Sequence, residues 1–170
     1  MAEPLNTPAQ SFDALYRESA RDLYAYVRTL LHDEASAEDV TALAFERAYR
    51  KRRGYRAGRG TREAWLFGIA RNAALDELRK RKRRAALEVE PEDATAPAPD
   101  ELADLAIRRE TVRAALATLD PRERELVALK FGAGLSNAEI ADVIDVSESN
   151  VGTRLHRTVN KLREACDGRA

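Results

Sequence analysis

Residues 120–164 read DPRERELVALKFGAGLSNAEIADVIDVSESNVGTRLHRTVNKLRE. The stretch opens on Asp120, Pro121 and Glu123, which combine an N-cap residue, a proline at the first helical position and the glutamate of a capping box. These residues predict a helix that begins at Pro121 and ends at the glycines that start with Gly132. Such start and stop signals indicate that this part of the chain is helical.

Two more helices are predicted in the same stretch, on either side of a tight turn. Ser136 and Glu139 form a second capping box, which predicts a short helix over 137–144. Ser147 then caps a longer helix over 148–164. A short helix, a tight turn and a longer helix are typical of a helix-turn-helix, a unit that often binds DNA.

The second helix of this unit has an outward polar face. Its members can donate hydrogen bonds to bases and phosphates: Ser149, Asn150, Thr153, Arg154, Arg157 and Lys161. In the major groove arginine pairs with guanine and asparagine with adenine, and the N–H groups at a helix start bind phosphate. A helical hairpin with a solvated charged face is the alternative. The agreement of caps, turn and basic face favours duplex DNA binding.

The remainder of the chain also has helical patterning. Of its 170 residues, 44% are hydrophobic, 6% aromatic and 34% charged, a profile of small helical modules. Apolar spacing predicts a helix over 11–31 with a buried side formed by Phe12, Leu15, Tyr16, Leu23, Val27, Leu30 and Leu31. Ser36 predicts the start of a second helix that ends near Arg50, and Thr61 caps a third over 62–84. The expected fold class is therefore all-α.

Charge divides the chain into three parts. Residues 1–84 carry 18 Lys and Arg against 12 Asp and Glu, residues 85–105 carry 7 acids and no base, and residues 106–170 carry 11 bases and 10 acids. The acidic part is rich in alanine and proline, a composition typical of linkers. We expect either a solvated spacer there or an acidic strap that competes with nucleic acid for the basic N-terminal half.

A glycine loop, GYRAGRG at 54–60, precedes the third predicted helix. Five arginines, one aromatic side chain, one amide and one carboxylate fall on this loop and on one face of the helix: Arg56, Arg59, Arg62, Trp65, Asn72, Asp76, Arg79 and Arg83. Rings on which bases stack, interleaved with cations that track phosphates, suit single-stranded nucleic acid. The alternative is a core tryptophan beside a solvated basic helix end.

Several function classes have no support in the sequence. Cys166 is the only cysteine, so neither an internal disulfide nor a cysteine-based zinc site can form, and an inert thiol is expected. His32 and His156 lack metal-ligand spacing, and no catalytic or cofactor-binding constellation is visible. No apolar run approaches the roughly 20 residues of a membrane span. The N-terminus does not have the pattern of a signal peptide, so we expect a cytoplasmic protein. Because no catalytic constellation is visible, we also expect that the protein is not an enzyme.

Two long stretches resemble regions of bacterial RNA polymerase sigma factors. Residues 12–84, with FDALYRESARDLYAYVRTLL, AEDVTALAFERAY and GTREAWLFGIARNAALDELRKRKRR, resemble region 2, and residues 105–165 resemble region 4. A chain with only these regions resembles the extracytoplasmic-function (ECF) group. The resemblance implies two small helical domains, over 10–84 and 105–166, joined by an acidic linker over 85–104. It also implies promoter recognition and DNA melting in transcription initiation.

The resemblance further implies roles for particular residues. The helix near 37–50 would dock on the clamp helices of the largest polymerase subunit through Asp39, Phe45 and Arg47. The glycine loop and third helix, with Lys80 added to the residues above, would hold the single-stranded −10 element. The last helix would read the duplex −35 element, and region 4 would sit on the flap of the second-largest subunit. An anti-sigma factor is a further expected partner, and membrane insertion is not expected.

The chain departs from the family pattern in two places. Ala42 and Leu43 stand where the family often has Gln-Glu, and Gly152 interrupts the recognition helix, where glycine costs about 1 kcal/mol relative to alanine. Two other functions are compatible with the sequence. A stand-alone helix-turn-helix regulator would bind a palindromic duplex as a dimer without polymerase, and a helical adaptor would bind an acidic protein instead of nucleic acid.

Overall fold

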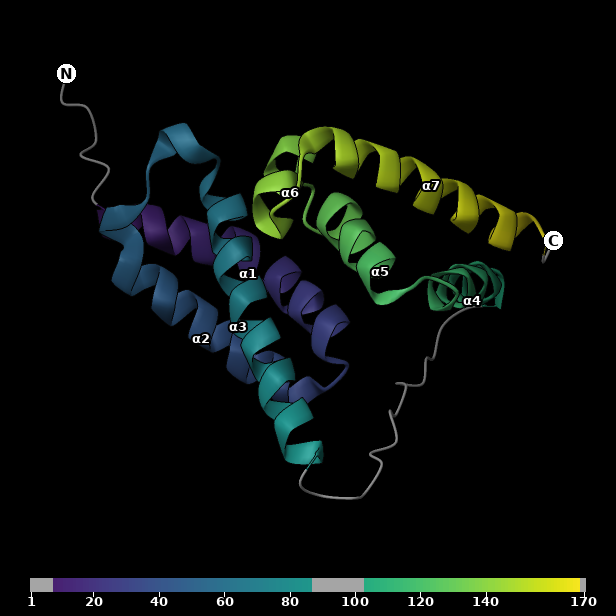
Figure 1. The fold of residues 1–170 in the computed structure, drawn as a ribbon, viewed down its shortest axis with the longest axis horizontal. Helices are drawn as coiled ribbons and strands as arrows, with labels where there is room; N and C mark the ends of the chain where they lie inside the picture. The colour runs from purple at the N-terminus through teal and green to yellow at the C-terminus, as the bar shows by residue number, and fades with distance from the viewer. Residues whose placement is uncertain (1–7, 87–102, 169–170) are drawn as a thin grey trace.

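The computed structural model describes residues 8–86 and 103–168. Within these ranges every regular element is helical, which confirms the predicted fold class. The elements are α1 (Pro8–Leu31), α2 (Glu34–Lys51), the short turns η1 (Arg52–Gly54) and η2 (Ala57–Arg59), α3 (Arg62–Ala85), α4 (Ala103–Ala117), α5 (Pro121–Val127), the π-helical turn η3 (Ala128–Gly132), α6 (Asn137–Ile144) and α7 (Glu148–Asp167). Helices α1–α3 form one group and α4–α7 another, side by side (Figure 1). Most of the expected acidic linker, and with it the strap hypothesis, lies outside the described residues.

The predicted caps of the C-terminal group are confirmed. The Asp120 carboxylate accepts the N–H groups of Arg122 and Glu123 at 2.8 and 2.9 Å, and Glu123 accepts the Asp120 N–H in return. Ser136 and Glu139 form the same reciprocal pair at the start of α6. These bonds satisfy N–H groups that have no partner within the helix.

The turn and last helix of the helix-turn-helix also form as predicted. Asp145 ends α6 in the left-handed conformation, with φ of 58°. Ser147 Oγ then accepts the Asn150 N–H at 3.2 Å and caps α7. Local sequence therefore determines the shape of this unit.

Two predictions about the N-terminal helices are wrong. Helix α2 begins at Glu34 rather than near Ser36, because Asp33 is the N-cap and accepts the Ser36 N–H at 2.9 Å. Tyr16, placed on the buried side of α1, is 52% exposed, since its position lies at the edge of the α1–α2 contact. Its ring still leans against Phe45, with 4.7 Å between the centroids.

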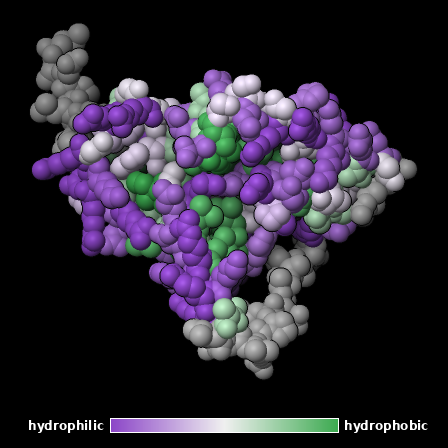
Figure 2. All heavy atoms as spheres, viewed as in Figure 1, coloured by the Kyte–Doolittle hydropathy of each residue, from purple (hydrophilic) through white to green (hydrophobic). Residues whose placement is uncertain are grey.

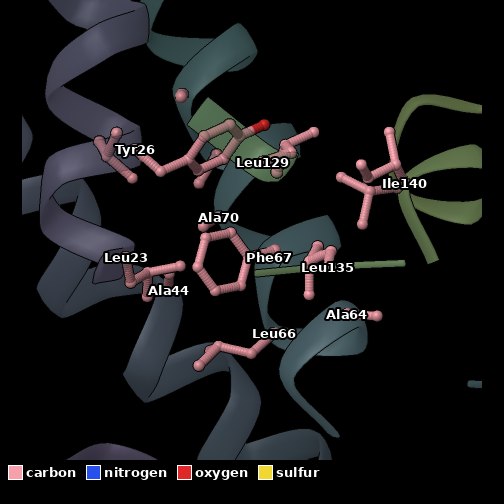
Figure 3. Packing of buried hydrophobic residues seen from close by; sticks show 14 of the residues in the cluster. Leu23, Tyr26, Ala44, Ala64, Leu66, Phe67, Ala70, Leu129, Leu135 and Ile140 are labelled. Atoms are coloured by element: carbon pink, nitrogen blue, oxygen red, sulfur yellow. The ribbon is translucent and has the colours of Figure 1, made fainter. Parts of the chain in front are cut away.

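One hydrophobic core runs through both groups of helices. Leu23 and Tyr26 of α1 and Phe67 of α3 are at most 2% exposed, and Leu129 and Ile140 from the C-terminal group are fully buried in the same cluster. Figure 3 shows these side chains converging on one interior. On the face drawn in Figure 2, hydrophilic residues cover most of the surface and apolar residues form small, separate patches. The two groups thus bury their apolar faces against each other.

A buried polar cluster joins the two groups within this core. The Tyr26 hydroxyl donates to Glu125 Oε1 at 3.0 Å, and Arg71 Nε donates to the same oxygen at 2.7 Å. Burial, together with the adjacent Glu125 carboxylate, raises the pKa of Tyr26 well above its ordinary value, so the phenol stays a donor. A buried charge of this kind needs its partners, so the cluster favours one register between the two groups.

Candidate nucleic-acid interface

The loop between α2 and α3 is held by its own side chains. The Tyr55 hydroxyl donates to the Gly60 carbonyl at 2.9 Å, across the short turn η2. Gly60 has φ of 112°, a conformation that residues with a Cβ rarely adopt. Thr61 follows as the N-cap of α3, and its Oγ1 accepts the Ala64 N–H at 3.2 Å. The loop therefore curves back on itself before α3 begins.

Beside the loop lies an open pocket of about 530 Å³, lined by Gly54, Tyr55, Arg56, Arg59 and Trp65. The Tyr55 and Trp65 rings lie 5.7 Å apart between centroids. The Arg62 guanidinium lies over the Tyr55 ring at 5.4 Å. Aromatic walls beside several guanidinium groups can hold a flat base while the cations neutralise the attached phosphates.

The structure brings the predicted −10 residues together on one continuous surface. Arg56 and Arg59 are exposed on the loop, Arg62 is exposed at the start of α3, and Trp65 is half-buried at the pocket. The rest are exposed along α3, namely Asn72, Asp76, Arg79, Lys80 and Arg83. Within this row Asp76 accepts a hydrogen bond from Arg79 at 2.8 Å, which orients that guanidinium along the exposed face of α3.

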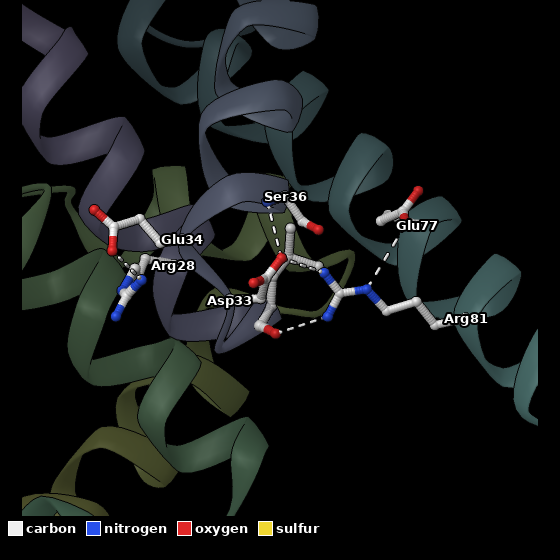
Figure 4. A network of polar contacts seen from close by, with 7 residues as sticks. Arg28, Asp33, Glu34, Ser36, Glu77 and Arg81 are labelled. Carbon is white, nitrogen blue, oxygen red and sulfur yellow. Dashed lines mark hydrogen bonds and ion pairs between the residues drawn. The ribbon is translucent and has the colours of Figure 1, made fainter. Parts of the chain in front are cut away.

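Arg81, within the basic run 79–84, joins two helices instead of facing solvent with the rest of the row. Arg81 donates to the Leu31 carbonyl at 3.0 Å and to Asp33 at 3.1 Å, and it lies 3.7 Å from Glu77 (Figure 4). Hydrogen bonds from Ser36, and then the charge of Arg81, hold the pKa of Asp33 below its ordinary value. Arg81 therefore ties the end of α3 to the start of α2, and we do not count it among DNA contacts.

The loop also touches the helix-turn-helix. The Thr61 hydroxyl donates to Glu139 Oε1 at the start of α6. Burial opposes ionisation of Glu139, but hydrogen bonds from Thr61 and Ser136 outweigh it and lower the pKa of that carboxyl. The C-terminal group thus anchors the far end of the loop.

The predicted −35 residues line the outer side of α7, but they differ in exposure and in the hydrogen bonds that they already make. Ser149, Asn150 and Arg157 are exposed, and Arg154 is half-buried. The Thr153 hydroxyl donates to the Ser149 carbonyl of its own helix at 3.0 Å. Lys161 donates to Glu123 Oε2 at 2.7 Å, which ties α7 to α5. Asn150, Arg154 and Arg157 are therefore better placed to contact DNA than Thr153 and Lys161.

The predicted polymerase-contact residues differ in accessibility. Asp39 is exposed and Arg47 is half-buried on α2. Phe45 is only 7% exposed, and its ring contacts those of Phe12 and Tyr16. Phe45 therefore supports the α2 surface from beneath, while Asp39 and Arg47 lie on it.

Sequence patterns missed several residues that shape these surfaces. Tyr55 stands within the quoted glycine loop, and its aromatic ring next to arginines was an available signal. The cluster of Tyr26, Arg71 and Glu125 had no such signal, because Glu125 lies 99 residues from Tyr26 and 54 residues from Arg71 in the chain. Only the packing of the two helical groups brings these three residues together.

The described residues offer neither a metal site nor a membrane span. No group of three His, Cys, Asp or Glu side chains within 8–86 and 103–168 could hold a metal ion. Of the helices described, none is both long and apolar enough to cross a bilayer.

Comparison with known proteins identifies the family of this chain. Residues 15–84 match the family model of sigma-70 region 2, and residues 109–162 match that of sigma-70 region 4. The ECF RNA polymerase sigma factor SigL of Mycobacterium tuberculosis is 34% identical over 155 residues, which cover 88% of this chain and 85% of SigL. SigX of Bacillus subtilis is 30% identical over 162 residues, covering 91% of this chain and 83% of SigX.

Solved structures give the same result. The sigma factor RpoE of Bartonella quintana, solved in complex with the anti-sigma factor NepR, has a TM-score of 0.74 at 26% identity and covers 93% of this chain and 98% of its own. CnrH, solved in complex with the cytosolic domain of CnrY, has a TM-score of 0.64 at 26% identity and covers 95% of this chain and 91% of its own. With both sigma-70 regions present over nearly its whole length, the chain belongs to the ECF RNA polymerase sigma factors, which act in transcription initiation.

Proposed function

We propose that this sigma factor captures the single-stranded −10 element in the 54–62 loop and along α3, while α7 reads the −35 element as duplex. The observation that supports the first role most strongly is the pocket whose lining includes the Tyr55 and Trp65 rings together with Arg56 and Arg59. Extruding a base from a duplex costs a few kcal/mol. Stacking of one base on a protein ring returns about 1–3 kcal/mol, so a single captured base offsets much of that cost.

The second role rests on the exposed side of α7. Asn150, Arg154 and Arg157 lie along it, and Ser147 orients the start of the helix. Bidentate contacts from such residues discriminate between base pairs by about 1–3 kcal/mol each. The two DNA sites therefore use different chemistry, with stacking at −10 and groove hydrogen bonds at −35.

Polymerase would bind the α2 surface and the C-terminal group. Asp39 and Arg47 would contact the clamp helices of the largest subunit, with Phe45 holding their helix in place, and the C-terminal group would sit on the flap of the second-largest subunit. We assign residues 10–84 to the domain that binds polymerase and the −10 element, and 105–166 to the domain that binds −35. The protein would act by binding rather than catalysis, without a cofactor.

We also propose regulation by an anti-sigma factor in the cytoplasm. RpoE and CnrH, two structurally similar sigma factors, were solved with the anti-sigma factor NepR and with the cytosolic domain of CnrY. The coverage of nearly all of this chain by both structures supports a comparable partner here.

The test compares two alanine variants in a complex with core RNA polymerase on promoter DNA. Arg154→Ala should weaken binding to a duplex −35 probe by about 1–3 kcal/mol. It should leave opening at −10 intact once the promoter is saturated with the polymerase complex. Asn72→Ala should leave −35 binding unchanged and reduce the permanganate reactivity of unpaired thymines at −10. Arg113→Ala, which changes an exposed arginine of α4 that belongs to neither proposed DNA surface, is the matched control.

Each outcome bears on the proposal. Wild-type chain that does not co-elute with core polymerase would contradict it outright. Equal loss of both activities in either variant would contradict the division of labour between α3 and α7.

A further inference from the structure

The start of helix α6 lies against the end of the 54–62 loop. The Thr61 hydroxyl donates to Glu139 Oε1, and the other oxygen of the same carboxylate accepts the Ser136 N–H at 2.7 Å. A Cβ added at Gly60 would lie 3.7 Å from Asp142 Oδ2, so a second carboxylate of α6 is beside the same part of the loop. Two acidic side chains of the C-terminal group are therefore close to the surface proposed to bind the −10 strand.

These two side chains place negative charge beside that surface. Hydrogen bonds from Thr61 and Ser136 lower the pKa of Glu139, although burial opposes its ionisation. Asp142 is exposed to water, where a carboxylate is charged at neutral pH. The exposed arginines of the loop attract the phosphates of a single strand, whereas the carboxylates repel them. The C-terminal group in this position thus weakens the attraction between the loop and the strand.

The two helical groups cannot bind both promoter elements while they are packed in this way. The −10 and −35 elements are about 25 base pairs apart, or roughly 85 Å of straight duplex at about 3.4 Å per base pair. Helix α6 touches the loop at its start, has eight residues and is therefore only about 12 Å long. Helix α7 begins directly after the turn that ends α6. Binding of both elements requires the groups to separate, which takes Glu139 and Asp142 away from the loop.

Core polymerase is the partner that can cause this separation. In the proposed function it binds the α2 surface through one subunit and the C-terminal group through another. A partner that binds the separated form more tightly than the packed form shifts the population toward the separated form. The packed arrangement then belongs to the chain before it binds polymerase.

We propose that α6 makes an autoinhibitory contact, in which Glu139 and Asp142 repel the −10 strand in the free chain and are withdrawn when polymerase separates the two groups. This inference rests on the proposed function, because it assumes that the loop binds the strand and that both promoter elements are bound at once. The contact lies within the chain itself and so acts without any anti-sigma factor.

The experiment measures how tightly the full chain, alone and in complex with core polymerase, binds a fluorescent single strand from a promoter that the complex opens. Glu139→Gln and Asp142→Asn each remove one charge, and glutamine can still form the capping box of α6. Each substitution should raise the affinity of the free chain about threefold at low salt, the effect of removing one like charge about 6 Å away in water. The gain should vanish near 1 M salt, where the Debye length is about 3 Å. In the polymerase complex both variants should match the wild type.

Glu110→Gln is the matched control, since it removes the same charge from a different part of the C-terminal group. Glu110 is 66% exposed and pairs with Arg113 on α4. Helix α4 and the 54–62 loop lie toward opposite ends of the molecule (Figure 1). Glu110→Gln should therefore bind the strand as the wild type does, both alone and with polymerase.

The outcomes distinguish this inference from the proposed function. If the wild-type polymerase complex does not bind the strand, the proposed −10 role fails. If the complex binds the strand but Glu139→Gln and Asp142→Asn gain no more than Glu110→Gln in the free chain, the autoinhibitory contact is overturned. Equal gains in the free and polymerase-bound forms would also overturn it, because the carboxylates would then repel the strand without the packed arrangement.

Discussion

The helix-turn-helix and the −10 loop are stabilised in opposite ways. The helix-turn-helix has caps that lie within three residues of the N–H groups they satisfy, as Ser136 does for Glu139 and Ser147 for Asn150. The loop depends on ring contacts across ten residues, from Tyr55 to Trp65, and on Glu139, which is 78 residues from Thr61. The helix-turn-helix is thus formed by local sequence, whereas the pocket beside Tyr55 needs the rest of the fold.

The two units should respond differently to amino-acid substitution. Caps contribute about 1 kcal/mol each and act on one helix at a time. The loop and the core beside it join both helical groups, so a change there affects the packing of the whole molecule. Substitutions at the junction should therefore be more damaging than substitutions at caps.

The largest effect is expected at Glu125, where α5 meets α1 and α3. Glu125→Leu leaves the Arg71 guanidinium and the Tyr26 hydroxyl without their shared acceptor inside the core. Removing one partner of a buried ion pair destabilises by about 3 kcal/mol or more. The free energy of unfolding, measured with urea on the full chain, should fall by that amount.

A surface pair provides the control for this substitution. Glu110 is 66% exposed and pairs with Arg113 at 3.2 Å, so Glu110→Leu should change stability by less than about 1 kcal/mol. Equal effects at Glu110 and Glu125 would show that the polar cluster does not hold the two helical groups together.

A smaller effect is expected at Gly60, at the end of the loop. Gly60→Ala places a Cβ on a residue with φ of 112°, which strains the backbone by about 1–3 kcal/mol or forces the loop to change. Gly58→Ala is the matched control, since nothing lies within 4 Å of its added Cβ and its φ is not in the strained range. Binding of single-stranded −10 DNA should fall for Gly60→Ala only. A loss in both variants would mean that the loop needs general flexibility rather than this one conformation.

The sequence predicted what local rules control and missed what distant contacts control. The caps at Asp120, Ser136 and Ser147 form as expected, because each acts on N–H groups a few residues away. The sequence predicts that α2 starts at Ser36, because the actual cap, Asp33, lies before the first residues of the periodic apolar pattern. Tyr55 was missed because its partners follow from the curvature of the loop. Nothing in the spacing of Glu125 indicates that a tyrosine and an arginine of the other group meet it.

The smallest expected effect is at the cap of α5 and depends on pH. The N–H groups of Glu123, and after it Arg122, hold the pKa of Asp120 below its ordinary value of about 3.9. Because the folded pKa is lower than the unfolded one, the stabilisation by Asp120 is fully present above about pH 4 and is lost as pH falls through the folded pKa. Asp120→Asn still accepts the same N–H groups but cannot titrate, so the stability of this variant should fall less than that of the wild type between about pH 5 and pH 3. Parallel stability curves for the two proteins would show that the carboxylate charge adds nothing to this cap, and that hydrogen bonding alone fixes the start of the helix-turn-helix domain.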